Sequence, residues 1–212
     1  MKTALRLVIF AAACCAGANT AAASLVVQVS DSAGKPLADV VVSADPEAGV
    51  VAPKHLKPAE IAQRGMKFHP TVSVIQTGSR IAFPNNDKVK HHIYSFSPAK
   101  KFDQKLYSGV AATPQVFDKA GLVVLGCNIH DRMVAYVKVV DSPWFAKTDS
   151  AGVARIEVPA GARYSVSAWH YNLSGASVAQ ALAVGPGDAP VALSFKLAMK
   201  AQVAEPALGV DN

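Results

Sequence analysis

The chain has 212 residues, of which 51% are hydrophobic and 17% charged, and its formal net charge is +6. This length accommodates one large β domain or two small ones. The modest positive charge does not by itself indicate a nucleic-acid-binding protein, and we expect no nucleic-acid partner.

Residues 1–23 have the pattern of a cleaved export signal. Lys2 and Arg6 are the only charged residues among them, the stretch at 5–18 is apolar, and three alanines at 21–23 form an A-x-A-like cleavage site. The apolar stretch is too short for a transmembrane span, and no later segment has about 18 uninterrupted apolar residues. We therefore expect a periplasmic protein without a transmembrane span in its mature chain.

Strand patterns dominate the remaining chain. Residues 24–50 hold two apolar runs on either side of a turn-rich connector, and residues 51–65, with Pro, Gly and mixed charge, are predicted to be a linker. Residues 66–141 form a second β block. Its strands are predicted at 68–74, 80–83, 92–96, 115–117, 122–125 and 134–140. The segment 127–133 is thus expected in a loop between two strands, with His91 at the start of a third.

A third block covers residues 142–199 and is followed by a tail at 200–212 that we predict to be flexible. Apolar and polar residues alternate at 153–158 and 163–169, and a last strand is expected at 191–197. Regular short strands separated by Gly and Pro turns are typical of β-sandwiches. The predicted fold class is therefore all-β.

Signal removal leaves Cys127 as the one cysteine of the mature chain, and it lowers the net charge from +6 to +4. A single cysteine cannot form an internal disulfide, so its presence in an exported protein calls for a physical reason. Metal ligation, intermolecular pairing and burial as a small hydrophobic side chain are all compatible with the composition.

Three potential metal donors lie within seven residues. Cys127, His130 and Met133 supply a thiolate, an imidazole and a thioether, and a second imidazole is available from His91 or His92 upstream. Two His, one Cys and a weak axial Met are the donor set of a blue copper electron-transfer site. Because successive strand residues face opposite sides, only one of the two adjacent histidines should ligate.

Zinc binding and nucleophilic catalysis fit this segment less well. A structural zinc site normally uses four Cys and His ligands and does not use Met. A Cys-His nucleophile pair is possible, but a separation of two residues usually aims such side chains apart, and no orienting acid is evident. In the remaining alternative Cys127 and Met133 fill the core and His130 lies on the surface.

The segments 83–93 and 126–133 resemble the ligand segments of plastocyanin/amicyanin-like cupredoxins, and the Cys-x-x-His-x-x-Met spacing is similar to the short ligand loop of amicyanin. The whole chain resembles periplasmic proteins labelled methylamine utilization proteins. This resemblance implies a cupredoxin-like Greek-key β-sandwich at 66–141 with one type 1 copper ion. Its ligands would be His91, Cys127, His130 and Met133.

One position departs from the family pattern. Cupredoxins commonly have Asn after the first His, where its side chain steadies the ligand loops, and this chain has His92 there. Either His92 takes that supporting role, or it is an alternative ligand in place of His91. We expect His91 to be the ligand.

The flanking segments resemble a carboxypeptidase regulatory-like domain. The similarity covers residues 29–40 and runs from the turn at 148–152 to residue 166. It implies that 24–50 and 142–199 together form a second, small Ig/transthyretin-like β-sandwich beside the copper domain.

The leading hypothesis is a one-electron carrier without substrate turnover, in which His130 is the electron exit edge. Lys88, Lys90, Lys100 and Lys101 would form a positive rim for an acidic redox partner such as a cytochrome or a dehydrogenase. A copper chaperone or sensor could use the same ligands. A non-catalytic β-sandwich binding module with an incidental motif is the third hypothesis.

Overall fold

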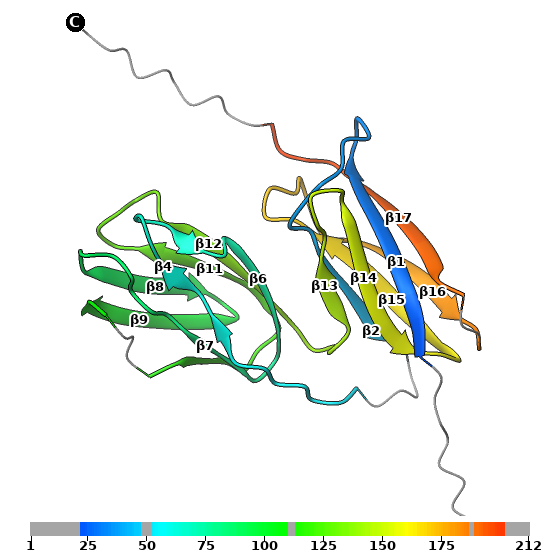
Figure 1. Ribbon diagram of the computed structural model, residues 1–212, viewed down its shortest axis with the longest axis horizontal. Coiled ribbons are helices and arrows are strands. Elements are labelled where there is room, and N and C mark those ends of the chain that lie inside the picture. Colours follow the sequence, from blue (N-terminus) through cyan, green and yellow to red (C-terminus); the bar gives the residue numbers. More distant parts are fainter. Residues whose placement is uncertain (1–21, 48–51, 110–112, 187–188, 202–212) are drawn as a thin grey trace, which may run out of the picture.

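The computed structural model describes residues 22–47, 52–109, 113–186 and 189–201, and these residues form strands and loops without a helix (Figure 1). The predicted all-β sandwich class is confirmed. Among the residues described, no helix is long and apolar enough to cross a membrane. Most of the expected signal peptide (1–21) and most of the expected tail (202–212) lie outside the described residues.

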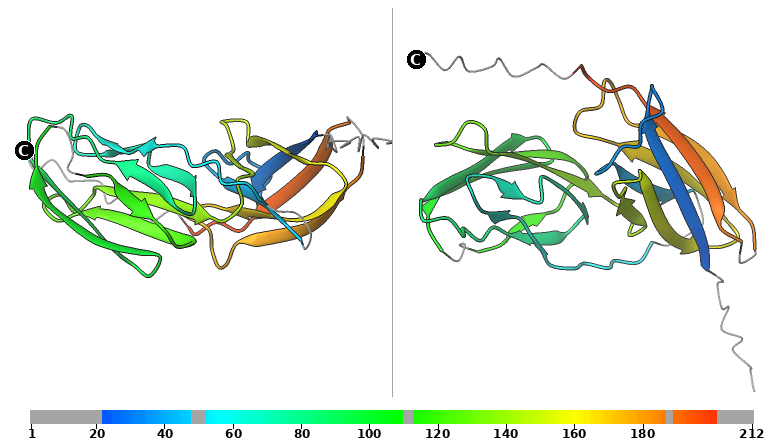
Figure 2. Two further views of the ribbon diagram at one scale, coloured as in Figure 1. Left: turned by 90° about the horizontal axis from the view of Figure 1, so that it is seen from below. Right: turned by 45° about the horizontal axis from the view of Figure 1, so that its top comes forward.

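The strands group into two units that lie side by side (Figures 1 and 2). The first, which we call the flanking unit, combines strands from both ends of the chain in two sheets of order β14-β1-β17 and β13-β2-β15-β16. Its strands are β1 (Ala22–Asp31), β2 (Val41–Pro46), β13 (Phe145–Lys147), β14 (Val153–Pro159), β15 (Ala162–Trp169), β16 (Val178–Val184) and β17 (Val191–Leu197).

The second unit lies between β2 and β13 in the chain, and we call it the inserted unit. It has a five-stranded sheet of order β6-β12-β11-β8-β9, a three-stranded sheet of order β10-β7-β3 and the pair β4-β5. Its strands are β3 (Ala59–Glu60), β4 (Ala62–Gln63), β5 (Phe68–His69), β6 (Val72–Gln76), β7 (Ser79–Ala82), β8 (His91–Ser97), β9 (Lys100–Tyr107), β10 (Gln115–Phe117), β11 (Gly121–Cys127) and β12 (Val134–Val140).

Alternating burial explains why these segments are strands. In β14, Ala154, Ile156 and Val158 are buried while Arg155 and Glu157 between them are exposed. Successive side chains of a strand point to opposite faces, so this pattern turns every second residue toward a shared apolar core. Each unit has such a core of its own.

The strands differ from the predicted ones at several places. The sequence patterns predict no strand at β9, β13 or β16, and the strand predicted at 68–74 is divided into β5 and β6. Ala22 and Ala23, expected at the end of the signal, belong to β1, where Ala22 pairs with Pro159. Residues 59–63, expected in the linker, form the short strands β3 and β4, because Ile61 between them is fully buried in the core of the inserted unit. The Pro and Gly residues of the predicted linker make such short strands difficult to recognise from the sequence.

The two units are in direct contact. Val72 of β6 is buried in the core of the flanking unit. Tyr136 of β12 stacks on Tyr171 at a ring-centroid distance of 5.0 Å. Lys147 of β13 donates a hydrogen bond to the carbonyl of Val72 over 2.9 Å. The outer face of β6 and β12 is therefore partly covered by the flanking unit.

Gly152, in the turn before β14, is expected to tolerate no side chain. Its φ is +75°, and an added Cβ would lie 2.4 Å from the carbonyl oxygen of Val29. Because left-handed backbone costs a non-glycine residue about 1–2 kcal/mol and overpacking about 1–3 kcal/mol more, Gly152→Ala should lower the free energy of unfolding by about 2–5 kcal/mol. Denaturant unfolding measures this loss.

Gly161 provides the matched control. Its φ is +76°, but nothing lies within 4 Å of an added Cβ. Gly161→Ala should therefore carry the backbone strain alone, about 1–2 kcal/mol. Equal losses for the two variants would show that the contact with Val29 contributes nothing.

Candidate metal centre

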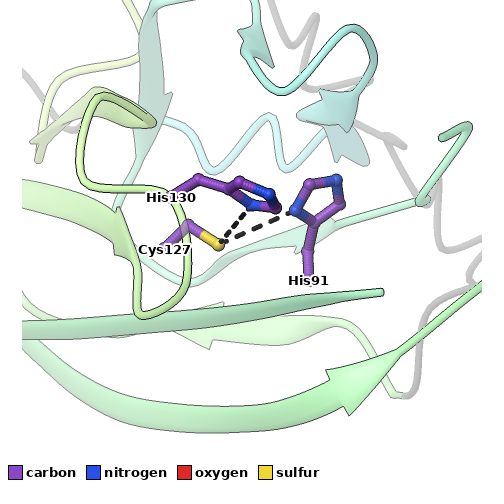
Figure 3. Close-up of side chains that lie close together, drawn as sticks. All are labelled: His91, Cys127 and His130. Atoms are coloured by element: carbon purple, nitrogen blue, oxygen red, sulfur yellow. Dashed lines mark hydrogen bonds between the residues drawn. The ribbon is translucent and has the colours of Figure 1, made fainter. Parts of the chain in front are cut away.

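Three of the predicted donors meet at one end of the inserted unit (Figure 3). His91 begins β8, Cys127 ends β11, and His130 lies in the loop between β11 and β12. β8 and β11 are adjacent antiparallel strands in which Cys127 pairs with Ile93. This pairing brings the start of one strand beside the end of the other, and so joins residues that are distant in the sequence.

The donor atoms converge on a small volume. The Nδ1 atoms of His91 and His130 each lie 3.7 Å from the Sγ of Cys127. The three donor atoms all lie within 4.8 Å of one another. A single ion could contact all three after small side-chain adjustments. Imidazole nitrogen with thiolate sulfur suits copper or zinc, and a thioether as the additional donor favours copper.

The three side chains differ in their access to solvent. His91 is fully buried, Cys127 is 4% exposed, and His130 is partly exposed. Two donors are therefore enclosed in protein, and the third connects the cluster with the surface. A metal held here would be shielded from water on the side of the sheet.

Met133 lies at the end of the same loop. Its side chain is 1% exposed and belongs to the hydrophobic core that also contains Cys127. Its backbone N–H donates to the carbonyl of His130 over 2.9 Å, which closes a tight turn. The loop thus directs its thioether residue into the interior of the unit that holds the cluster.

His92 lies apart from the three donors. Its Nε2 contacts the carboxylate of Asp103 on β9. Its backbone carbonyl accepts a hydrogen bond from the N–H of Asn128, the residue after Cys127, over 3.0 Å. The neighbouring His91 faces Cys127, as strand alternation requires. In this arrangement His92 supports the ligand loop through its backbone, while its side chain is bound elsewhere.

A carboxylate orients His91. The Nε2 of His91 lies 2.9 Å from Oδ2 of Asp87, a side chain that is itself held by the backbone N–H groups of Gly65 at 2.6 Å and Met66 at 3.0 Å. An ionised carboxylate only accepts, so Nε2 carries the proton and Nδ1 keeps its lone pair for a metal. This is the tautomer that ligation through Nδ1 needs.

The electrostatics of Asp87 support this tautomer. Burial raises the pKa of its carboxyl, but the hydrogen bonds from Met66, His91 and Gly65 outweigh that effect and hold the pKa below its ordinary value. The carboxylate therefore remains ionised at neutral pH. The sequence prediction did not include Asp87. Its position four residues before a potential ligand could have revealed it, because metal-binding histidines usually pair their second nitrogen with a carboxylate or carbonyl.

Asp87→Asn is expected to weaken copper binding by about 10–100-fold, the usual effect of losing an outer-sphere carboxylate. The amide cannot hold the His91 tautomer as a carboxylate does. Competition of the chain with a chelator of known copper affinity measures the change. Asp103→Asn is the matched control, because it removes the same contact from His92 and should leave the copper affinity unchanged. Equal losses would contradict a specific role of Asp87.

The predicted docking lysines do not form one cluster. Lys88 and Lys90 are exposed in the turn before His91. Lys100 and Lys101 pair with Ser97 and Phe96 at the far end of β8. β8 has 7 residues, so its ends lie about 20 Å apart at about 3.4 Å per residue. The two pairs therefore belong to two different surfaces.

Comparison with known proteins finds similarity only in part of the chain. No protein-family model matches it, and no curated protein matches it. Among solved structures, a purple cupredoxin from Nitrosopumilus maritimus is 22% identical with a TM-score of 0.35, covering 39% of this chain and 99% of that chain. Amicyanin from Paracoccus versutus (Thiobacillus versutus) is 18% identical with a TM-score of 0.36, covering 49% of this chain and 100% of that chain.

A copper-containing nitrite reductase (NirK) from Thermus scotoductus SA-01 is also similar, with 21% identity and a TM-score of 0.38 over 45% of this chain and 25% of that chain. The overlap with these structures is partial and the TM-scores are low. The assignment of a metal to the cluster therefore depends on its own donors.

Proposed function

We propose that this chain is a periplasmic type 1 copper protein that carries single electrons between redox partners. The observation that carries the proposal is the convergence of His91 and His130 Nδ1 on the Sγ of Cys127, each at 3.7 Å. His91, Cys127 and His130 would hold the ion, and Met133 would be the weak axial ligand. Bound copper would supply a reversible one-electron centre.

The surroundings of the donors favour a carrier over a copper chaperone. His91 and Cys127 lie on adjacent strands of one sheet, and Asp87 holds the ring of His91. Ligands on rigid elements change little in position, which suits an ion that changes oxidation state in place. A chaperone must release its ion, and for that purpose mobile ligands are more suitable.

The exposure of His130 supports a role as the contact with redox partners. It is the one of the three clustered side chains that is not buried, and Ile129 beside it is 47% exposed. An exposed apolar residue beside a partly exposed ligand favours close approach of a partner. The lysines near His91 would favour an acidic partner.

Copper loading of the mature protein tests this function. The carrier should show an intense visible thiolate-to-copper absorption when oxidised, and lose it reversibly on reduction. A colourless copper-loaded protein would contradict the type 1 assignment. Rapid loss of cuprous ion to a chelator would favour the chaperone instead.

A further inference from the structure

An exposed apolar patch lies on the outer face of the five-stranded sheet. We define the outer-sheet patch as Tyr94 and Phe96 of β8, Val124 of β11 and Val134 of β12. Phe96 is 77% exposed, Val124 38% and Val134 37%. The four residues line a shallow depression of about 340 Å³. An aromatic side chain so exposed beside further apolar residues is typical of an interaction surface.

The patch lies directly behind Cys127. Tyr94 pairs with Gly126, the residue before Cys127. The ring of Tyr94 covers this glycine so closely that an added Cβ would lie 2.8 Å from its Cζ atom. Tyr94 also packs against Phe96, with ring centroids 5.1 Å apart. One peptide unit thus separates the patch from the thiol residue of the proposed metal centre.

The flanking unit does not cover the patch. Farther along the same face of β12, Tyr136 stacks on Tyr171 of the flanking unit. Val134 precedes Tyr136 by two residues on this face and remains exposed. Among the described residues, the contact with the flanking unit therefore stops where the patch begins.

Positive charge borders the patch on the side of β9. Lys101 pairs with Phe96 and therefore lies on the face of the patch, whereas Lys100 pairs with Ser97 and starts on the opposite face. Lys105 is exposed farther along this edge strand. The one acid of β9, Asp103, pairs with Tyr94, and its carboxylate contacts the ring of His92. An apolar centre with a charged rim is the usual composition of a transient protein interface.

We propose that the outer-sheet patch docks an acidic redox protein, with Phe96 and Tyr94 as apolar anchors and Lys101 and Lys105 of β9 as partners of its carboxylates. The charge complementarity selects an acidic partner. That the partner is a redox protein rests on the proposed copper function, because its reason is the proximity to Cys127. This surface is distinct from the His130 end of the unit, where Lys88 and Lys90 lie.

The experiment uses a plant-type ferredoxin as the probe, since it is a small acidic redox protein. Isothermal titration calorimetry at about 10 mM and about 200 mM ionic strength, with metal-free and copper-loaded chain, measures its binding. We expect the chain to bind the ferredoxin more weakly at the higher ionic strength. Phe96→Asp should weaken this binding by about tenfold or more. Val178→Asp, an equal charge change at a 38% exposed apolar residue of β16 in the flanking unit, is the matched control and should change binding little. Val89→Asp tests the His130 end, and its loss of binding should be smaller than that of Phe96→Asp.

Three results would overturn the proposal. These are no binding at low salt, a larger loss for Val89→Asp than for Phe96→Asp, or a Phe96-dependent dimer of the chain in sedimentation equilibrium. Circular dichroism of each variant confirms that it is folded. A colourless copper-loaded chain would contradict the proposed function alone, because binding to the metal-free chain is measured independently.

Discussion

Cys127→Ser should abolish the visible absorption of the copper-loaded protein completely. The absorption arises from the thiolate–copper bond, and a serine hydroxyl neither ionises near neutral pH nor provides a soft donor. Cys127 is the one cysteine among the described residues, and both histidine Nδ1 atoms lie 3.7 Å from its sulfur, so no second described thiol can replace it in this cluster. Visible spectra of the two proteins at equal copper loading provide the measurement.

The fold should survive this substitution. Serine is smaller than cysteine, and burial of its hydroxyl between the two imidazoles costs about 1–3 kcal/mol at most when it lacks a good partner. Thermal unfolding of the metal-free proteins checks this expectation. If Cys127→Ser keeps the absorption, the thiolate is not a ligand and the type 1 assignment is wrong.

The second large expected effect is a difference in visible absorption between variants of the two adjacent histidines, His91 and His92. His91→Gln should eliminate the visible absorption, because it removes a fully buried donor and its contact with Asp87. His92→Gln should retain the absorption. It removes the partly exposed contact with Asp103, which is worth about 0–1 kcal/mol of stability. Copper titrations followed by absorption compare the variants.

The reverse result would reassign the ligand. Loss of colour in His92→Gln together with its retention in His91→Gln would require a shift of β8 by one residue against β11. Loss in both variants, with folded metal-free proteins, would indicate that His92 controls the ligand loop through more than its backbone carbonyl.

Much of the fold could be predicted from local patterns. The alternation of residues in β14 and in 163–169 is visible in the sequence because every second residue is apolar. The short strands β3 and β4 could not be predicted in the same way. Two residues are too few to show a period, and their pairing depends on β7 and β5, which come later in the chain.

The predicted docking lysines show a different limit of prediction from sequence. Lys88, Lys90, Lys100 and Lys101 are close in sequence, which suggested a single basic rim. The β8–β9 hairpin separates them, because Lys100 and Lys101 follow the far end of β8. Only the length and direction of that strand show that two surfaces are involved.

The donor chemistry of the cluster is a local property of the chain. Cys127, His130 and Met133 lie within one short loop, so their identity and spacing can be taken directly from the sequence. The folded arrangement determines which histidine faces the thiol, that Asp87 orients its ring, and that Tyr94 covers Gly126 behind Cys127. The physical reason is that alternation places adjacent residues on opposite faces of a strand, while the pairing of β8 with β11 and the packing of the sheet determine which face is the interior.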